Sequence, residues 1–214
     1  MTGNTVYDQM RQDRLQLISL SEKGDIKAVK ALLDKGVYIH SQDKDGKCAI
    51  VAAAYNNHIE TTELLIKAGA DVNMKDNTIQ SAYLIAAMRG FLELLRITMM
   101  AGAIINSTDS DNGTALIRAS DRGHVEVIKE LLKTDIRVNH VNRLGWTALL
   151  EAIILGHGDE PHTEIVQLLI NAGADIALTD KDGVSPLEHA KRNSYLGIVK
   201  VIEESKQYQE LYKK

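Results

Sequence analysis

The decapeptides LLIKAGADVN (residues 64–73) and LLINAGADIA (residues 168–177) share seven of their ten residues. A second similarity joins GTALIRASDRGH (residues 113–124) to GWTALLEAIILGH (residues 145–157). Self-similarity at a fixed distance is typical of repeat proteins, in which each unit stacks on the next.

A small residue at the start of each helical segment fixes the period. It recurs at Cys48, Ser81, Thr114, Thr147 and Ser185, with three intervals of 33 residues and a last one of 38. One step of 33 back from Cys48 reaches Leu15, where LQLISLSEKGDIKAVKALLDKG fits the frame without a cap residue. We therefore expect six repeats in a single domain spanning residues 1–214. Their predicted limits are 10–42 (N-terminal cap), 43–75, 76–108, 109–141, 142–179 and 180–214 (C-terminal cap).

Each repeat has the pattern of two short helices. The hydroxyl of Thr114 or Thr147 can accept a backbone N–H left unpaired at a helix start, and Pro186 follows Ser185 where proline suits the first turn. The second helix is richer in Leu and Ile at helical spacing, and a glycine such as Gly69 ends it. Helices this short are not stable alone, so the repeats must bury their apolar faces on one another.

The repeat resembles the ankyrin repeat. The resemblance rests on residues 145–149 (GWTAL), 123–127 (GHVEV) and 68–73 (AGADVN), and it covers residues 12–204. It implies an all-α solenoid of stacked helix-turn-helix units with short β-hairpin or turn fingers, whose usual role is protein recognition through the concave face. Ile79 and Asn112 stand where a turn glycine is expected. TDIR (residues 134–137) replaces Ala-Gly-Ala-Asp, so we expect an irregular helix end there.

The bulk composition is ordinary for a soluble protein. The 214 residues are 44% hydrophobic but only 4% aromatic, so Leu, Ile and Ala must supply the core. A net charge of −4 offers no basic face for nucleic acid. The longest uncharged apolar run, residues 48–55, is too short to cross a bilayer, and Asp8 and Asp13 interrupt any secretory signal. The single Cys48 allows no internal disulfide, and we expect a cytoplasmic protein.

The stretch GHGDEPH (residues 156–162) holds the densest set of potentially reactive side chains. In the repeat frame it contains a five-residue insertion, with His157 aligned to His124 and given its packing role. Asp159, Glu160 and His162 are then free polar groups, a weak set for structural zinc, although His162 or Glu160 could cap the next helix. The acidic turns at 43–46 and 109–113 lack the glutamate that a calcium loop needs at its twelfth position. We predict no catalytic residue, no metal site and no cofactor.

The outward positions of the fingers and first helices form the predicted partner-binding site. The fifth repeat stands out, because four of its five variable positions are apolar. Apolar surface on this scale indicates a partner, and Trp and Arg dominate interface energetics. The alternative is that the two apolar residues before Gly156 pack under the inserted loop. The predicted site residues, centred on Trp146, are Tyr55, Met88, Arg89, Arg122, Arg143, Leu144, Trp146, Ile154 and Leu155.

Three functions are open at this point. We expect a non-enzymatic scaffold that binds another protein, and neither nucleic acid nor a membrane, as a monomer or at most a weak dimer. A second hypothesis is a metal-binding or enzymatic protein that uses residues 156–162. A third is a self-associating structural protein that dimerises through the surface around Trp146.

Overall fold

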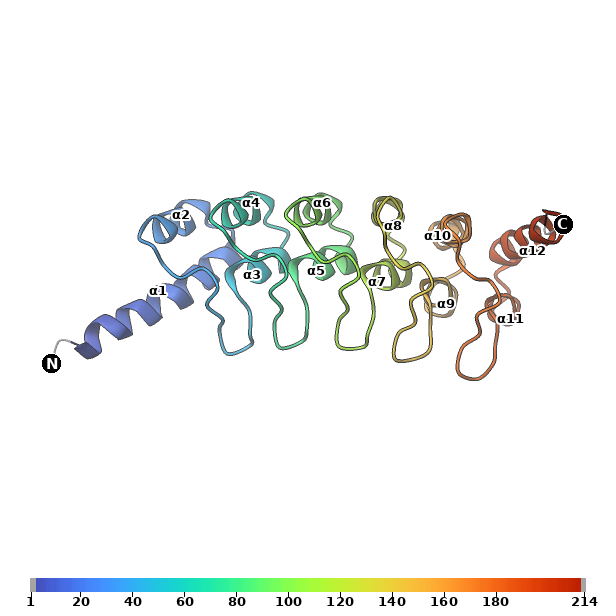
Figure 1. The fold of residues 1–214 in the computed structure, drawn as a ribbon, viewed down its shortest axis with the longest axis horizontal. Helices are drawn as coiled ribbons and strands as arrows, with labels where there is room; N and C mark the ends of the chain where they lie inside the picture. Colours follow the sequence, from blue (N-terminus) through green and yellow to red (C-terminus); the bar gives the residue numbers. More distant parts are fainter. Residues whose placement is uncertain (1–2, 213–214) are drawn as a thin grey trace. The chain divides into compact units, whose positions relative to one another are not determined.

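The computed structural model describes residues 3–212, which form twelve helices in consecutive pairs joined by finger-like loops (Figure 1). The first helix of each pair lies next to the fingers and is called an inner helix; the second is an outer helix. The inner helices are α1 (Gly3–Lys23), α3 (Ala49–Tyr55), α5 (Ala82–Arg89), α7 (Ala115–Asp121), α9 (Ala148–Ile154) and α11 (Pro186–Arg192). The outer helices are α2 (Ile26–Asp34), α4 (Ile59–Lys67), α6 (Leu92–Met100), α8 (Val125–Leu131), α10 (Glu160–Asn171) and α12 (Leu196–Tyr212).

The fingers are turns without strands. Among the described residues the one bridge of the β type joins Thr108 to Thr114, at the base of a single finger. The predicted all-α arrangement of helix pairs and short fingers is therefore confirmed. None of the helices in this part of the chain is long and apolar enough to span a bilayer.

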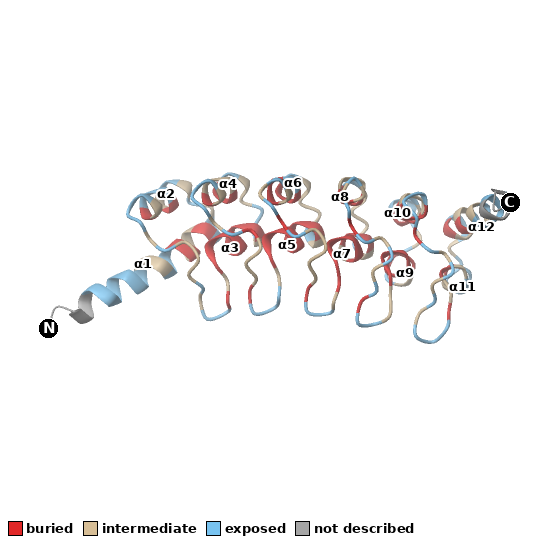
Figure 2. Ribbon diagram, viewed as in Figure 1, coloured by how far each residue is buried: buried red, intermediate tan, exposed pale blue. Residues whose placement is uncertain are grey.

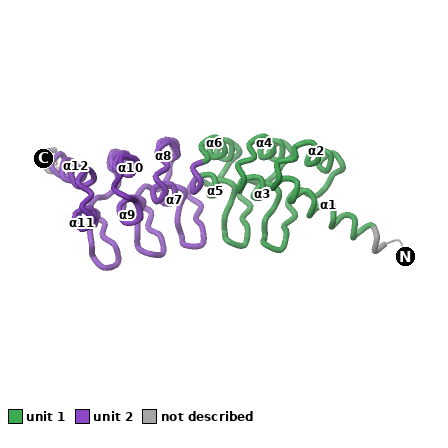
Figure 3. Tube along the Cα trace, turned by 180° about the vertical axis from the view of Figure 1, so that it is seen from behind, with its two compact units in different colours: residues 1–86, 91–104 green, residues 87–90, 105–214 purple. Residues whose placement is uncertain are grey.

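The chain divides into two compact units (Figure 3). The N-terminal unit comprises residues 1–86 and 91–104, and the C-terminal unit comprises residues 87–90 and 105–214, so the boundary passes through α5. In the N-terminal unit α1 packs on α3, and α2 and α6 pack on α4. In the C-terminal unit α7 and α11 pack on α9, while α8 and α12 pack on α10. Within each unit, inner helices thus stack on inner helices and outer on outer. The exact repeat limits and the single domain stay predictions.

Small residues in the inner helices allow this close stacking. Ala52, Ala53 and Ala54 in α3 have no exposed surface, and Ala119 in α7 and Ala152 in α9 are equally buried (Figure 2). Outer helices contribute larger apolar side chains to the same core. Within each unit, burial of this apolar layer, and not the helix propensity of seven-residue segments, holds the helix pairs together.

The predicted helix starts are confirmed. The hydroxyls of Thr114, Thr147 and Ser185 each accept the backbone N–H three residues on, and Ser81 does the same at 3.3 Å. Cys48 takes the equivalent position without a side-chain hydrogen bond, and burial raises the pKa of its thiol.

The predicted departures from regular geometry are also present. Ile79 and Asn112 both adopt the left-handed backbone conformation, with φ of 62° and 60°. A side chain branched at Cβ is strained in this region, whereas asparagine tolerates it. The helix end before residues 134–137 is also irregular: α8 ends after seven residues, whereas the equivalent helices α4 and α6 have nine.

Candidate partner-binding site

Each finger is folded around one side chain at its base. Its Oδ1 atom accepts two backbone N–H groups of the same finger, at 2.9–3.0 Å in every case. In the fifth repeat, Oδ1 of Asn142 accepts from the amides of Leu144 and Trp146. The finger that presents much of the predicted site is therefore held by one residue. These anchor residues are Asp43, Asp76, Asp109, Asn142 and Asp180.

In the fourth repeat the anchor is an ion pair with the inner helix α7. Nε of Arg118 donates to Oδ2 of Asp109 at 2.5 Å, and the same guanidinium donates to Asp111 at 2.8 Å. Burial works to raise the pKa of Asp109, but the hydrogen bonds and positive charge of Arg118 outweigh it, so the pKa is lowered. The sixth repeat is similar, since the ring of His189 lies 2.7 Å from Oδ2 of Asp180.

The fifth repeat reverses this chemistry. Asn142 replaces the anchor aspartate, and its Nδ2 donates to Oε1 of Glu151 at 2.6 Å. Glu151 is completely buried in α9, and its Oε2 has no hydrogen-bond partner among the described residues. Burial, reinforced by the charge of Asp121, raises the pKa of Glu151 to about 7. A buried acid, and not an ion pair, therefore supports the finger that carries Trp146.

Eight of the nine predicted site residues lie in the C-terminal unit. Leu144 at the tip of the fifth finger is 53% exposed, and Leu155 at the end of α9 is 43% exposed. Trp146 and Ile154 are half-buried, and Arg143, which precedes Leu144 in the chain, is exposed. Two large apolar side chains of the fifth repeat thus face solvent, on a finger and a helix end that are both fixed by hydrogen bonds.

The other predicted residues have different surroundings. Arg122 is exposed, and its Nε lies 3.2 Å from the carboxylate of Asp121. Met88 is half-buried and Arg89 exposed, at the end of α5. Tyr55 belongs to the N-terminal unit, where its hydroxyl donates to Oδ2 of the anchor residue Asp76 at 2.6 Å. Tyr55 therefore supports the third finger.

In the N-terminal unit, the repeat position that corresponds to Trp146 is occupied by Lys47, whose contacts show what surrounds this position. Nζ of Lys47 lies 5.6 Å from the ring centroid of Tyr55 and 3.6 Å from Oε1 of Glu22. Successive repeats place equivalent residues in equivalent surroundings. Lys47, Tyr55 and Glu22 correspond, 99 residues later, to Trp146, Ile154 and Asp121 respectively.

The fold and its repeat register agree with one family. The description "Ankyrin repeats (3 copies)" matches residues 15–97 and 83–180, which is well over half of the chain. The chain belongs to the ankyrin repeat family. Proteins built from ankyrin repeats are generally protein-interaction modules.

Two solved ankyrin structures are similar over most of the chain. An ankyrin repeat domain from Acinetobacter baumannii AYE is 46% identical, with a TM-score of 0.86, over 89% of this chain and 97% of that one. EF0377, an ankyrin repeat protein, is 32% identical, with a TM-score of 0.82, over 88% of this chain and 96% of that one. A comparison with curated proteins gives no match.

The five extra residues of the fifth ankyrin repeat are divided between two places. A residue with positive φ marks the turn between the helices of each pair, and Gly123, Gly158 and Ser194 are the last three of these. Their spacing is 35 and then 36 residues, against 33 earlier in the chain. Two extra residues therefore precede Gly158, and three follow it. The latter lengthen α10 to 12 residues.

The packing role predicted for His157 belongs instead to His162. His157 is exposed, whereas His162 is 4% exposed and its Nε2 donates to the carbonyl oxygen of Asp121 at 3.3 Å. His124 makes the equivalent bond to the carbonyl of Met88 at 3.1 Å. The prediction was wrong because the extra turn of α10 carries His162 into the ring position, although the letters Gly-His align with residues 156–157.

The prediction that Glu160 or His162 caps α10 was also wrong. Asp159 is the cap, because its Oδ1 accepts the backbone N–H of His162 at 3.1 Å. The same oxygen lies 2.6 Å from Nδ1 of His162, and this hydrogen bond lowers the pKa of Asp159. Both ring nitrogens of His162 are thus engaged, so His162 is not a free ligand. Nowhere in residues 3–212 do three or more His, Cys, Asp or Glu side chains form a group that could hold a metal ion.

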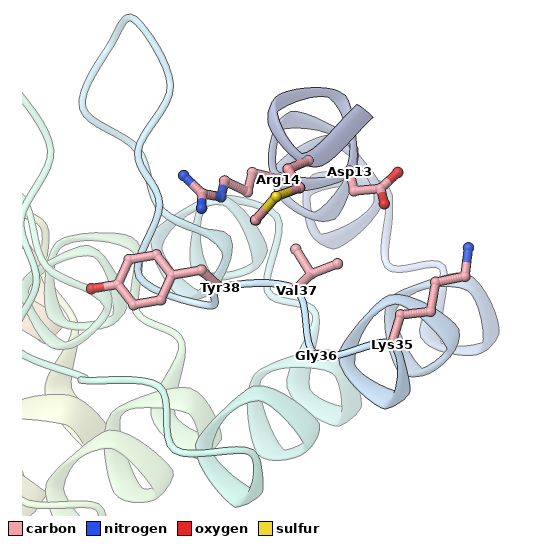
Figure 4. Close-up of a pocket in the computed structure, with 7 residues that line it drawn as sticks. Asp13, Arg14, Lys35, Gly36, Val37 and Tyr38 are labelled. Carbon is pink, nitrogen blue, oxygen red and sulfur yellow. The ribbon is translucent and has the colours of Figure 1, made fainter. Parts of the chain in front are cut away.

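Two pockets lie near features already described. One, of about 460 Å³, is lined by Asp121, Leu155, His157 and neighbouring residues of the inserted turn. The other, of about 160 Å³, lies in the N-terminal unit between α1 and residues 35–38, where the guanidinium of Arg14 is 5.8 Å from the ring centroid of Tyr38 (Figure 4). The larger pocket is lined by two predicted site residues, Arg122 and Leu155, and the smaller one includes none of the predicted residues.

Proposed function

We propose that this ankyrin-repeat protein is a non-enzymatic scaffold that binds a partner protein through one surface of its C-terminal unit. The observation that carries the proposal is the exposure of Leu144 and Leu155 on a finger and a helix end fixed by hydrogen bonds. Apolar side chains that are held rigidly in solvent cost little entropy when a partner covers them. The Trp146 surface, as we name it, consists of Leu144, Trp146, Ile154 and Leu155, with Arg122 and Arg143 at its rim.

The repeat register supports Trp146 as the centre of this surface. Its equivalent, Lys47, lies over the ring of Tyr55, which corresponds to Ile154. Trp146 is accordingly expected to lie over Ile154, with Leu144 and Leu155 at its sides. A half-buried tryptophan surrounded by aliphatic side chains and exposed arginines is the composition of an interface hot spot.

The test compares Trp146→Ala with a matched control in the same unit. Leu196→Ala removes an apolar side chain that is 77% exposed on the outer helix α12, away from the fingers. Both tagged variants are used to recover partners from the source cell, and the affinity of the partner recovered by the unchanged protein is then measured by titration calorimetry.

We expect Trp146→Ala to weaken binding by at least about 2 kcal/mol, roughly 30-fold, and Leu196→Ala to leave it unchanged. Circular dichroism of both variants checks that the fold is intact. Equal affinities for Trp146→Ala and the unchanged protein would refute the proposed surface. Light scattering of the purified protein tests the third hypothesis, because self-association through this surface would be lost in Trp146→Ala.

A further inference from the structure

The fifth finger is supported by a buried acid where its neighbours use an ion pair. We propose that Asn142 and Glu151 form a proton-responsive anchor, in which neutral Glu151 holds the finger closed on α9 and ionised Glu151 loosens it. The Trp146 surface would then differ between the two protonation states. This inference goes beyond the proposed binding function, and its test needs no partner, so the two can fail separately.

The connection between the acid and the surface is a single side chain. The amide nitrogen of Asn142 donates to Oε1 of Glu151, while its carbonyl oxygen accepts from the backbone of Leu144 and Trp146. Because Oε1 already accepts a hydrogen bond, the proton of neutral Glu151 is carried by Oε2, the oxygen without a partner. Asn142 therefore links the carboxyl of Glu151 directly to the backbone that positions Trp146.

The charges on α7 do not neutralise Glu151. Arg118 attracts the carboxylate, but its guanidinium donates to Asp109 and Asp111 at 2.5 and 2.8 Å. Asp121, near the end of the same helix, repels it. Asp109 repels it as well, and Arg118, the cation that attracts ionised Glu151, is already held between two other carboxylates.

The other helices packed on α9 are α10 and α11. On α11, Lys191 pairs with Glu203 at 2.7 Å and Arg192 is exposed to solvent. From α11, the ring of His189 is bonded to Asp180 at 2.7 Å. From α10, the buried titratable side chain is His162, whose nitrogens bond to Asp159 and to the carbonyl of Asp121. A buried carboxylate in such surroundings is costly, and admitting water beside it relieves the cost. Water reaches this site by movement of the finger, because Glu151 has no exposed surface when the finger is closed.

The pH range of the switch follows from the titration of Glu151. Its pKa is raised to about 7, so the carboxyl is neutral in mildly acidic solution and ionised in mildly alkaline solution. The closed finger is accordingly expected below about pH 7, and the loosened finger above it.

The chain provides its own probe, because Trp146 is its only tryptophan. Fluorescence quenching by acrylamide is measured on the full chain over about pH 5.5 to 8.5. We expect one step with a midpoint near the pKa of about 7, and stronger quenching on its alkaline side. Glu151→Gln should remove the step and hold the quenching at its low-pH value, since the amide stays neutral and keeps an oxygen for Nδ2 of Asn142.

Three further variants make the result specific. His162→Gln and His189→Gln remove the nearby imidazoles and should leave the step in place. Asn142→Ala keeps the acid but cuts its connection to the finger, so the step at Trp146 should be lost while Glu151 still titrates in carbon-13 NMR spectra. A step that survives in Glu151→Gln, a step that a histidine variant abolishes, or constant quenching in the unchanged protein would each overturn the proposal.

Discussion

The fourth and fifth fingers close with equivalent backbone hydrogen bonds but have opposite side-chain chemistry. The backbone N–H of Asp109 donates to the carbonyl oxygen of Gly113 at 3.0 Å in the fourth finger, and that of Asn142 donates to the carbonyl oxygen of Trp146 at 3.0 Å in the fifth. In the fourth finger the base is a carboxylate and the inner helix supplies the cation, whereas in the fifth the base is a neutral amide and the inner helix supplies the acid. The fold therefore specifies the hydrogen bonds to the finger backbone and leaves the charge of the anchor free to vary.

This difference has opposite consequences for stability as pH changes. The lowered pKa of Asp109 means that its contribution is present above the carboxyl's ordinary pKa and lost as pH falls. The raised pKa of Glu151 means that its penalty is absent below the ordinary pKa of 4.5, grows between there and about 7, and is complete above. At neutral and alkaline pH, the anchor of the fourth finger thus stabilises the fold, whereas the buried acid of the fifth finger destabilises it.

Breaking the ion pair of the fourth finger should have the largest effect. Asp109→Ala removes the acceptor of two finger amides and leaves Arg118 without its buried partner, so we expect a loss of about 4 kcal/mol in the free energy of unfolding. Urea unfolding followed by circular dichroism measures it. Asp111→Ala is the control, because that carboxylate is 61% exposed and pairs with the same guanidinium. Its loss should stay below about 1 kcal/mol, and equal losses would contradict the role given to Asp109.

Replacing the buried acid of the fifth finger with a neutral side chain should instead increase the free energy of unfolding. The rise in the pKa of Glu151 from 4.5 to about 7 corresponds to about 3 kcal/mol at alkaline pH. Glu151→Gln removes this penalty but buries an amide N–H group without an acceptor, so we expect about 2 kcal/mol of added stability at pH 8. The gain should shrink toward pH 5 in urea unfolding experiments. A gain that does not depend on pH would show that the carboxyl is not neutral in the folded protein at low pH.

Substitution of the turn residue that adopts a positive φ should change stability less, and the effect should differ between the third and fourth fingers. Ile79 is strained at φ 62°, so Ile79→Gly should add about 1 kcal/mol to the free energy of unfolding. Asn112 tolerates the same conformation, and its Nδ2 donates to the carbonyl of Val141 at 3.0 Å. Asn112→Gly loses that bond and should change stability by less than about 0.5 kcal/mol. If thermal melts show equal gains for both variants, backbone strain is not the cause.

Much of the fold was predictable because the repeat places caps and turns at fixed positions. Cap residues such as Thr114 and Thr147 follow from the chemistry of helix starts, and the turn at Ile79 from the missing glycine. The split of the insertion was not predicted, since matching letters placed Gly156-His157 on Gly123-His124. Asp159, Glu160 and Pro161 held the missing signal, because a capping aspartate before proline is typical of a helix start.

The candidate site was predictable only in part. The pattern of apolar positions located Leu144 and Leu155, whose exposure depends on which side of the finger and helix they occupy. The role of Asn142 was missed, although it interrupts a series of aspartates spaced by 33 residues. No sequence rule relates this change to Glu151 nine residues later, because the pairing depends on how the finger folds back on α9.

The comparison between the two fingers depends most on the protonation of Glu151 in the folded protein. Carbon-13 NMR of side-chain carboxyl groups follows each titration directly, and the spectrum of Glu151→Gln identifies the signal of Glu151. We predict that Glu151 titrates with a midpoint near 7 while Asp109, in the same spectra, titrates below its ordinary value. A midpoint for Glu151 near the ordinary 4.5 would contradict the account, because the base of the fifth finger would then contain a charged carboxylate at neutral pH.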